Sequence, residues 1–147
     1  MRKTFVMRGQ TASGGTEVLN FGKYKQGYAY KLTEFKLFPS TSIGAELPEM
    51  CGTITTGKVA VAPTDPNFNN DGLIGTALFE QENIARGGPS AYSIVNDTYV
   101  ITQNLILMVQ DAGTGSPVNW HCRFESVKMS GPEEAAVNYK QFAISDE

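Results

Sequence analysis

The stretch Val118-Asn119-Trp120-His121-Cys122-Arg123-Phe124 places an apolar residue at every second position. Successive side chains of a β-strand point to opposite faces, so this spacing predicts a strand with one buried face and one polar face. His121, the only histidine of the chain, then lies on the face opposite Trp120 and Cys122. The stretch predicts that sheets, rather than helices, build the core.

Similar signals recur along the chain, at residues 3–8, 16–21, 27–38, 51–61, 73–79 and 99–109. In residues 27–38 the apolar alternation shifts phase between Leu32 and Phe35, which predicts a β-bulge. Turn-rich segments separate the runs, and the long connections at 39–50, 63–72 and 80–96 argue against a simple meander. We therefore expect an all-β fold, an antiparallel, jelly-roll-like β-sandwich of about seven or eight strands.

Composition supports one such domain spanning residues 1–147. The chain is 18% charged, with 15 Gly and 7 Pro, which excludes a coiled coil, a disordered tail and a disulfide scaffold. A chain of this length buries enough surface to fold without disulfides or metal.

One helix is expected at the C-terminus, over about residues 131–143. Ser130-Gly131-Pro132-Glu133 forms a capping box, and Ala135, Tyr139 and Phe142 then share one helical face. This helix either lies on the edge of the sandwich or docks a neighbouring subunit.

Charge is unevenly spread along the chain. Residues 1–36 carry seven basic and two acidic side chains, and the remainder carries five and thirteen. Either these charges are scattered over solvated faces, or they form a dipole. Such a dipole would orient the domain against an anionic partner or a copy of itself. The sequence pI is about 5.2, whereas nucleic-acid-binding domains usually exceed about 9. We therefore do not expect nucleic acid as the main ligand.

The two cysteines, Cys51 and Cys122, fit no zinc or redox spacing. Both lie in strand-like runs, where free cysteine behaves as a small buried hydrophobe, and whether they pair stays open. The apolar run at the start is too short for a signal peptide, and no stretch is long enough to span a membrane. We expect a protein made in a cytoplasm, with no membrane partner.

Catalytic signals are weak, so we expect no enzyme and no cofactor. Cys122 points away from His121, whereas a nucleophile and its base must lie within hydrogen-bond reach. The loop at 67–72 resembles a calcium loop, but the place of its bidentate glutamate is taken by Leu78. We expect no metal there. Its weak candidate ligands are Asp65, Asn67, Asn69 and Asp71, and the alternative is a set of turns in which these side chains bond nearby backbone.

Aromatic residues supply the candidate contacts with subunits or ligands. Tyr24, Tyr28 and Tyr30 alternate with lysines, a pattern that fits base or sugar stacking, a half-buried strand face, or a subunit interface. The full candidate set is Tyr24, Tyr28, Tyr30, Phe68, Trp120, Tyr139 and Phe142.

Four segments resemble small virion proteins of marine bacteriophages. They are Ile94–Asp97 with Val100–Leu105, then Val118–Glu125, then Val127–Ala135 running to Asn138–Gln141, and the opening Thr16–Gly22. The resemblance covers about half of the chain. It implies a compact β-sandwich that assembles in a viral capsid or on its surface, and it supplies no functional residues.

These observations lead to one expectation and one alternative. The expectation is a bacteriophage virion structural protein, located in the virion, that contacts copies of itself and other capsid proteins as a homo-oligomer. Nucleic acid is then expected only as the packaged genome, near the basic N-terminal third. The alternative is a carbohydrate-binding β-sandwich module, assisted by calcium at the Asn/Asp loop.

Overall fold

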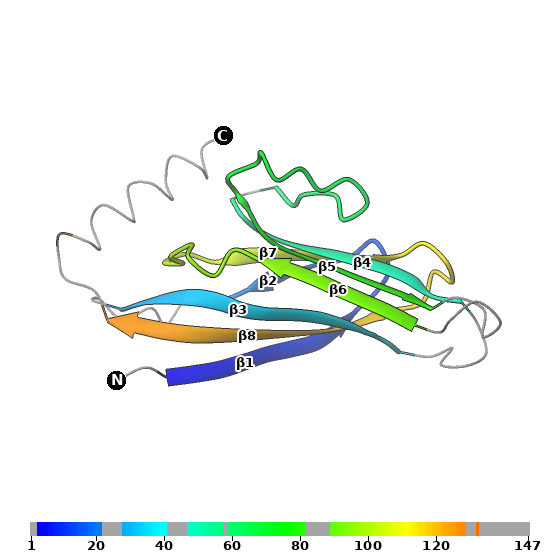
Figure 1. Ribbon diagram of the computed structural model, residues 1–147, viewed down its shortest axis with the longest axis horizontal. Coiled ribbons are helices and arrows are strands. Elements are labelled where there is room, and N and C mark those ends of the chain that lie inside the picture. Colours follow the sequence, from blue (N-terminus) through cyan, green and yellow to red (C-terminus); the bar gives the residue numbers. More distant parts are fainter. Residues whose placement is uncertain are drawn as a thin grey trace.

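The computed structural model describes residues 3–21, 28–40, 47–57, 59–81 and 89–128, together with Pro132. These residues form eight strands: β1 (Lys3–Thr11), β2 (Thr16–Leu19), β3 (Tyr28–Pro39), β4 (Glu49–Thr56), β5 (Leu73–Gln81), β6 (Pro89–Val95), β7 (Leu105–Asp111) and β8 (Val118–Lys128). They pair into two antiparallel sheets, with strand orders β1-β8-β3 and β2-β7-β4-β5-β6. The sheets lie face to face as two layers (Figure 1), which confirms the predicted β-sandwich.

The strands pair in a nested order. The first strand pairs with the last, β2 with β7, and β4 with β5. Nested pairing of this kind rolls one long antiparallel ribbon into two sheets, as in a jelly roll. Of the two remaining strands, β3 pairs with β8. Strand β6 pairs with β5 and also lies beside β3 of the other sheet, so the two layers approach each other along that side.

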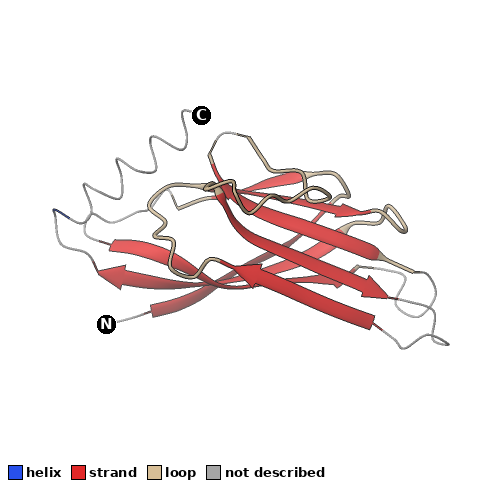
Figure 2. Cartoon of the chain, turned by 45° about the horizontal axis from the view of Figure 1, so that its top comes forward, coloured by secondary structure: helices blue, strands red, loops and turns tan. Residues whose placement is uncertain are grey.

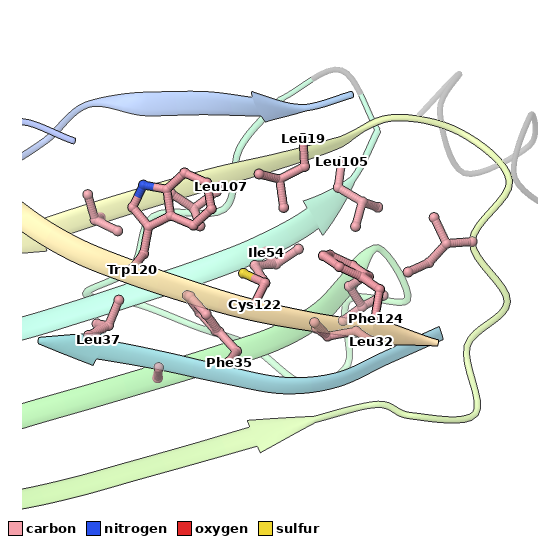
Figure 3. Packing of buried hydrophobic residues seen from close by; sticks show 14 of the residues in the cluster. Leu19, Leu32, Phe35, Leu37, Ile54, Leu105, Leu107, Trp120, Cys122 and Phe124 are labelled. Carbon is pink, nitrogen blue, oxygen red and sulfur yellow. The ribbon is translucent and has the colours of Figure 1, made fainter. Parts of the chain in front are cut away.

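The core lies between the sheets (Figure 3) and is built by the alternation of inward side chains. Leu32 and Phe35 of β3 and Phe124 of β8 are fully buried against residues of the five-stranded sheet. Burying a side chain of this size contributes roughly 1.5–3 kcal/mol. Gly75 faces these large residues across the layers, and a Cβ there would lie 2.9 Å from Leu32 Cδ2. Small residues on one sheet thus accommodate large ones on the other.

The phase shift predicted in the third strand is a real irregularity. The register of β3 against β8 shifts between Leu32 and Glu34. This β-bulge returns Phe35 and Leu37 to the core, where both are buried. The strand keeps one apolar face on both sides of the bulge.

The strand expected over residues 51–61 ends at Thr56 as β4, and two further expectations needed correction. Residues 80–96, expected as a connection, contain β6 (Figure 2). Conversely, β7 begins only at Leu105, and residues before it contribute an isolated bridge between Ile101 and Tyr30. Tertiary position explains both differences. Strand β6 forms through its ladder with β5 at the edge of the five-stranded sheet, and Ile101 is buried without belonging to a ladder.

The expected helix at 131–143 lies outside the described residues, except for Pro132. Within the described part of the chain, no helix is long and apolar enough to cross a membrane.

Candidate functional site

Charge is segregated between the two sheets. Every lysine and arginine of the described residues lies on the three-stranded sheet, at Lys3, Arg8, Lys31, Lys36, Arg123 and Lys128. That sheet carries only two of the described carboxylates, Glu34 and Glu125. The others lie on the five-stranded sheet and its loops, at Glu17, Glu49, Asp65, Asp71, Glu80, Asp97 and Asp111. The folded domain is therefore electrically polar across its thickness.

The outer side of the three-stranded sheet is named here the basic face. Arg8 and Lys36 flank His121 in register on the three strands, so three basic residue types form one row. Arg8 and Lys36 also line a shallow groove of about 770 Å³ on this face. The row is a cationic surface, because opposed side chains of one sheet face lie close together.

One carboxylate partly offsets this charge. Glu34 lies 2.9 Å from Lys36 Nζ and 3.6 Å from Arg123 Nε. The hydrogen bond from Lys36 lowers the pKa of Glu34, opposed by its partial desolvation. Arg8, on the far side of His121, keeps the remaining row positive.

The outer side of β4, β5 and β6 is named the acidic face. Glu49 and Glu80 stand directly opposite each other in the β4–β5 ladder. Next to them the ladders place Leu78 opposite both Cys51 and Tyr92, and Thr76 opposite Ile94. The face therefore joins a pair of like charges to an apolar strip.

A loop folds over part of this face. The described residues between β4 and β5, 57 and 59–72, lie above these strands in Figure 1. Thr53 Oγ1 donates a 2.6 Å hydrogen bond to the carbonyl of Val61, and the Val61 N–H donates to Thr55 Oγ1. Between the loop and the sheet lies a groove of about 450 Å³, named here the apolar groove and lined by Cys51, Pro63, Thr64, Pro66, Thr76, Ala77, Leu78, Tyr92, Ser93 and Ile94.

The predicted contact aromatics are not brought together. Trp120 is only 8% exposed and faces the core, which corrects its assignment as a contact residue. Tyr30 packs in an aromatic cluster with Phe5 and Phe21, so it too is largely removed from the surface. Among the others, Tyr28 and Phe68 are exposed, whereas Tyr24, Tyr139 and Phe142 lie outside the described residues.

The surface residues that sequence reasoning missed are Tyr92 and Ile94 of β6. Their alternation with Ser93 was the available signal.

The Asn/Asp loop is organised by hydrogen bonds to its own backbone. Asn67 Oδ1 accepts from the N–H of Asn69, and Asn70 Oδ1 accepts from the N–H of Gly72. These are the side-chain turns that the alternative interpretation expected. Across the described residues, no group of three or more His, Cys, Asp or Glu lies close enough to hold a metal ion.

Both cysteines are free, which answers the open question of their pairing. Cys122 is fully buried on the inner face of β8, and burial strongly raises the pKa of its thiol. Cys51 is half-buried beside the apolar groove, and its pKa is raised by burial and by the charge of Asp111. Raised thiol pKa values oppose nucleophilic chemistry at neutral pH.

His121 lies on the outer side of β8, because the strand alternates it with the buried Trp120 and Cys122. Its register neighbours on either side are the cations Arg8 and Lys36, and Cys122 belongs to the opposite face.

No family model matches the chain, and no curated protein is significantly similar to it.

Proposed function

We propose that this chain is a structural protein of a bacteriophage particle, a capsid or capsid-associated subunit that acts by self-assembly and by contact with other coat proteins. The sandwich would serve as a rigid block, and its outer faces would make the contacts. Neither a cofactor nor a bond-making step enters this proposal.

One observation carries the proposal: the apolar strip on the acidic face. Leu78, Tyr92 and Ile94 are 42%, 67% and 60% exposed, and they lie on neighbouring strands of one face. Contiguous exposed apolar patches mark interaction sites, whereas isolated apolar side chains are ordinary on a protein surface. Tyrosine is also enriched at subunit contacts. We expect a neighbouring subunit to pack on this strip.

The first test is self-association of the purified chain. We expect concentration-dependent oligomers in sedimentation velocity, and loss of these oligomers in the double variant Tyr92→Ser/Ile94→Ser. Val59→Ser is the matched control, because Val59 is 79% exposed and does not line the apolar groove. A wild-type chain that stays monomeric up to roughly millimolar concentration would contradict the proposal.

The second test is made on particles. Quantitative mass spectrometry of purified virions should find the chain in many copies per particle. Its absence, or a trace amount that washes away, would overturn the assignment to the virion.

The carbohydrate-binding alternative has one observation in its favour. Phe68 and Tyr92 are exposed aromatics, 63% and 67%, near the grooves of the five-stranded sheet. A glycan array with and without calcium tests it. Binding that Tyr92→Ser abolishes would favour this function over self-assembly, and an array without hits would count against it.

A further inference from the structure

We propose that copies of this chain associate head to tail, with the basic face of one copy seated on the acidic face of the next. This inference rests on the proposed function, because it specifies how the subunits would assemble. The molecule that covers each face is a second copy of this chain, because the charges of the two faces are complementary.

Each face holds like charges close together in the isolated chain. Glu49 and Glu80 are directly opposed on neighbouring strands, an arrangement that is destabilising in a sheet. On the other face, Arg8 and Lys36 stand on either side of His121, and Glu34 lies close to both Lys36 and Arg123, so one carboxylate partly offsets two cations. A neighbour of opposite sign would offset the repulsion between Glu49 and Glu80 and the positive charge that remains on the basic face.

Apolar side chains accompany the charges on both faces. On the basic face Val6 is 40% exposed and Phe38 is 57% exposed, and Phe38 lines the groove beside Lys36. On the acidic face the corresponding strip is Leu78, Tyr92 and Ile94. Protein interfaces combine a less charged centre with a polar rim, and each face offers both parts.

Opposite charge favours a head-to-tail contact over a symmetric one. A two-fold dimer places the same patch of both subunits together, so Arg8 and Lys36 would meet their own copies. The two outer faces belong to different layers of the sandwich (Figure 1), so one face stays open when the other is covered. Contacts of this kind continue from subunit to subunit and close into rings when the rotation permits.

A charge exchange between the faces tests the proposal. Variant Arg8→Glu/Lys36→Glu reverses the basic row, and variant Glu49→Lys/Glu80→Lys reverses the acidic pair. We expect each variant alone to associate at least about tenfold more weakly than wild type at 50 mM salt, because each presents like charges at the contact. An equimolar mixture should regain association, since the two reversed faces then match each other.

The mixture also shows that both variants are folded, because a misfolded chain would not restore the contact. Asp71→Lys/Asp97→Lys is the matched control for Glu49→Lys/Glu80→Lys. It makes the same change of net charge at Asp71 and Asp97, which lie in loops outside the Glu49–Glu80 row, and it should leave association unchanged. The wild-type association should weaken at 500 mM salt.

Other outcomes overturn the inference. Self-association that neither double variant weakens would sink the head-to-tail contact and leave the proposed self-assembly standing. Variants that associate weakly alone but do not recover on mixing would also sink it. A wild-type chain that stays monomeric, yet binds duplex DNA in a manner that Arg8→Glu/Lys36→Glu abolishes, would assign the basic face to nucleic acid and overturn both proposals.

Discussion

The indole Nε1 of Trp120 donates a 3.0 Å hydrogen bond to Thr11 Oγ1, and both residues are buried. The bond joins β8 to the end of β1, its neighbour in the three-stranded sheet. Thr11 Oγ1 donates in turn to Glu17 Oε1 at 3.2 Å. The indole is thereby fixed in the core with its polar atom satisfied, which is why the one tryptophan contributes no surface platform.

Removal of this acceptor should destabilise the fold. We expect Thr11→Val to lower the free energy of unfolding by about 1–3 kcal/mol, because the buried indole N–H loses its partner. Urea denaturation measures the change. Thr11→Ser keeps the hydroxyl and should retain most of the stability, so equal losses in the two variants would show that the hydrogen bond is unimportant.

Gly9 is required by the same indole. A Cβ at Gly9 would lie 2.8 Å from Trp120 Cζ2, too close without displacement of the ring. Gly9→Ala should therefore cost about 1–3 kcal/mol of stability. In a Trp120→Phe background the fused indole is replaced by a single ring, and Cζ2 is absent. The loss of stability caused by Gly9→Ala should then be smaller. A double-mutant cycle with no coupling would argue against this contact.

Asp111 organises the loop between β7 and β8. Its Oδ1 accepts from the N–H groups of Glu49, Gly113 and Thr114, and its Oδ2 accepts a 2.6 Å hydrogen bond from Thr114 Oγ1. Burial raises the pKa of Asp111, but these hydrogen bonds outweigh burial and hold the pKa below its usual value. The ionised carboxylate is thus the form that the fold stabilises.

A lowered native pKa means that the unfolded chain binds the proton first as the pH falls. The stabilisation from Asp111 is therefore complete above about pH 5 and is lost as the pH falls below about 4, from the ordinary carboxyl pKa toward the lowered native one. We expect Asp111→Asn to lose about 1–3 kcal/mol at pH 7, with a smaller difference from wild type at pH 3. Urea midpoints at the two pH values check this, and a constant difference would refute it.

The two thiols should react very differently. Cys122 is fully buried and Cys51 is half-buried, so a thiol reagent at pH 8 should modify only Cys51 in the native protein. The raised pKa of Cys51 predicts slower reaction than that of a free thiol. Denaturant should expose both. Native Cys51→Ser should be unreactive, and fast modification of Cys122 in that variant would contradict the described core.

Much of the fold followed from local pattern. The alternation through Trp120, Cys122 and Phe124 predicted which face of that strand is buried, and the shift after Leu32 predicted the bulge found there. Both depend only on the two-residue period of a strand. The strand at Pro89–Val95 was missed because Tyr92 and Ile94 alternate only briefly and remain exposed.

The sequence by itself determined the β class, the inward residues and an uneven distribution of charge along the chain. Only the tertiary structure decided which strands pair, because the ladder that joins Phe5 to Phe124 depends on the packing of the whole core. That pairing brings β1 and β3 to either side of β8 and gathers Lys3, Arg8, Lys31 and Lys36 on one sheet. The uneven charge along the sequence thereby becomes a difference in charge between the two sheets, since distant strands come together only after both sheets have formed.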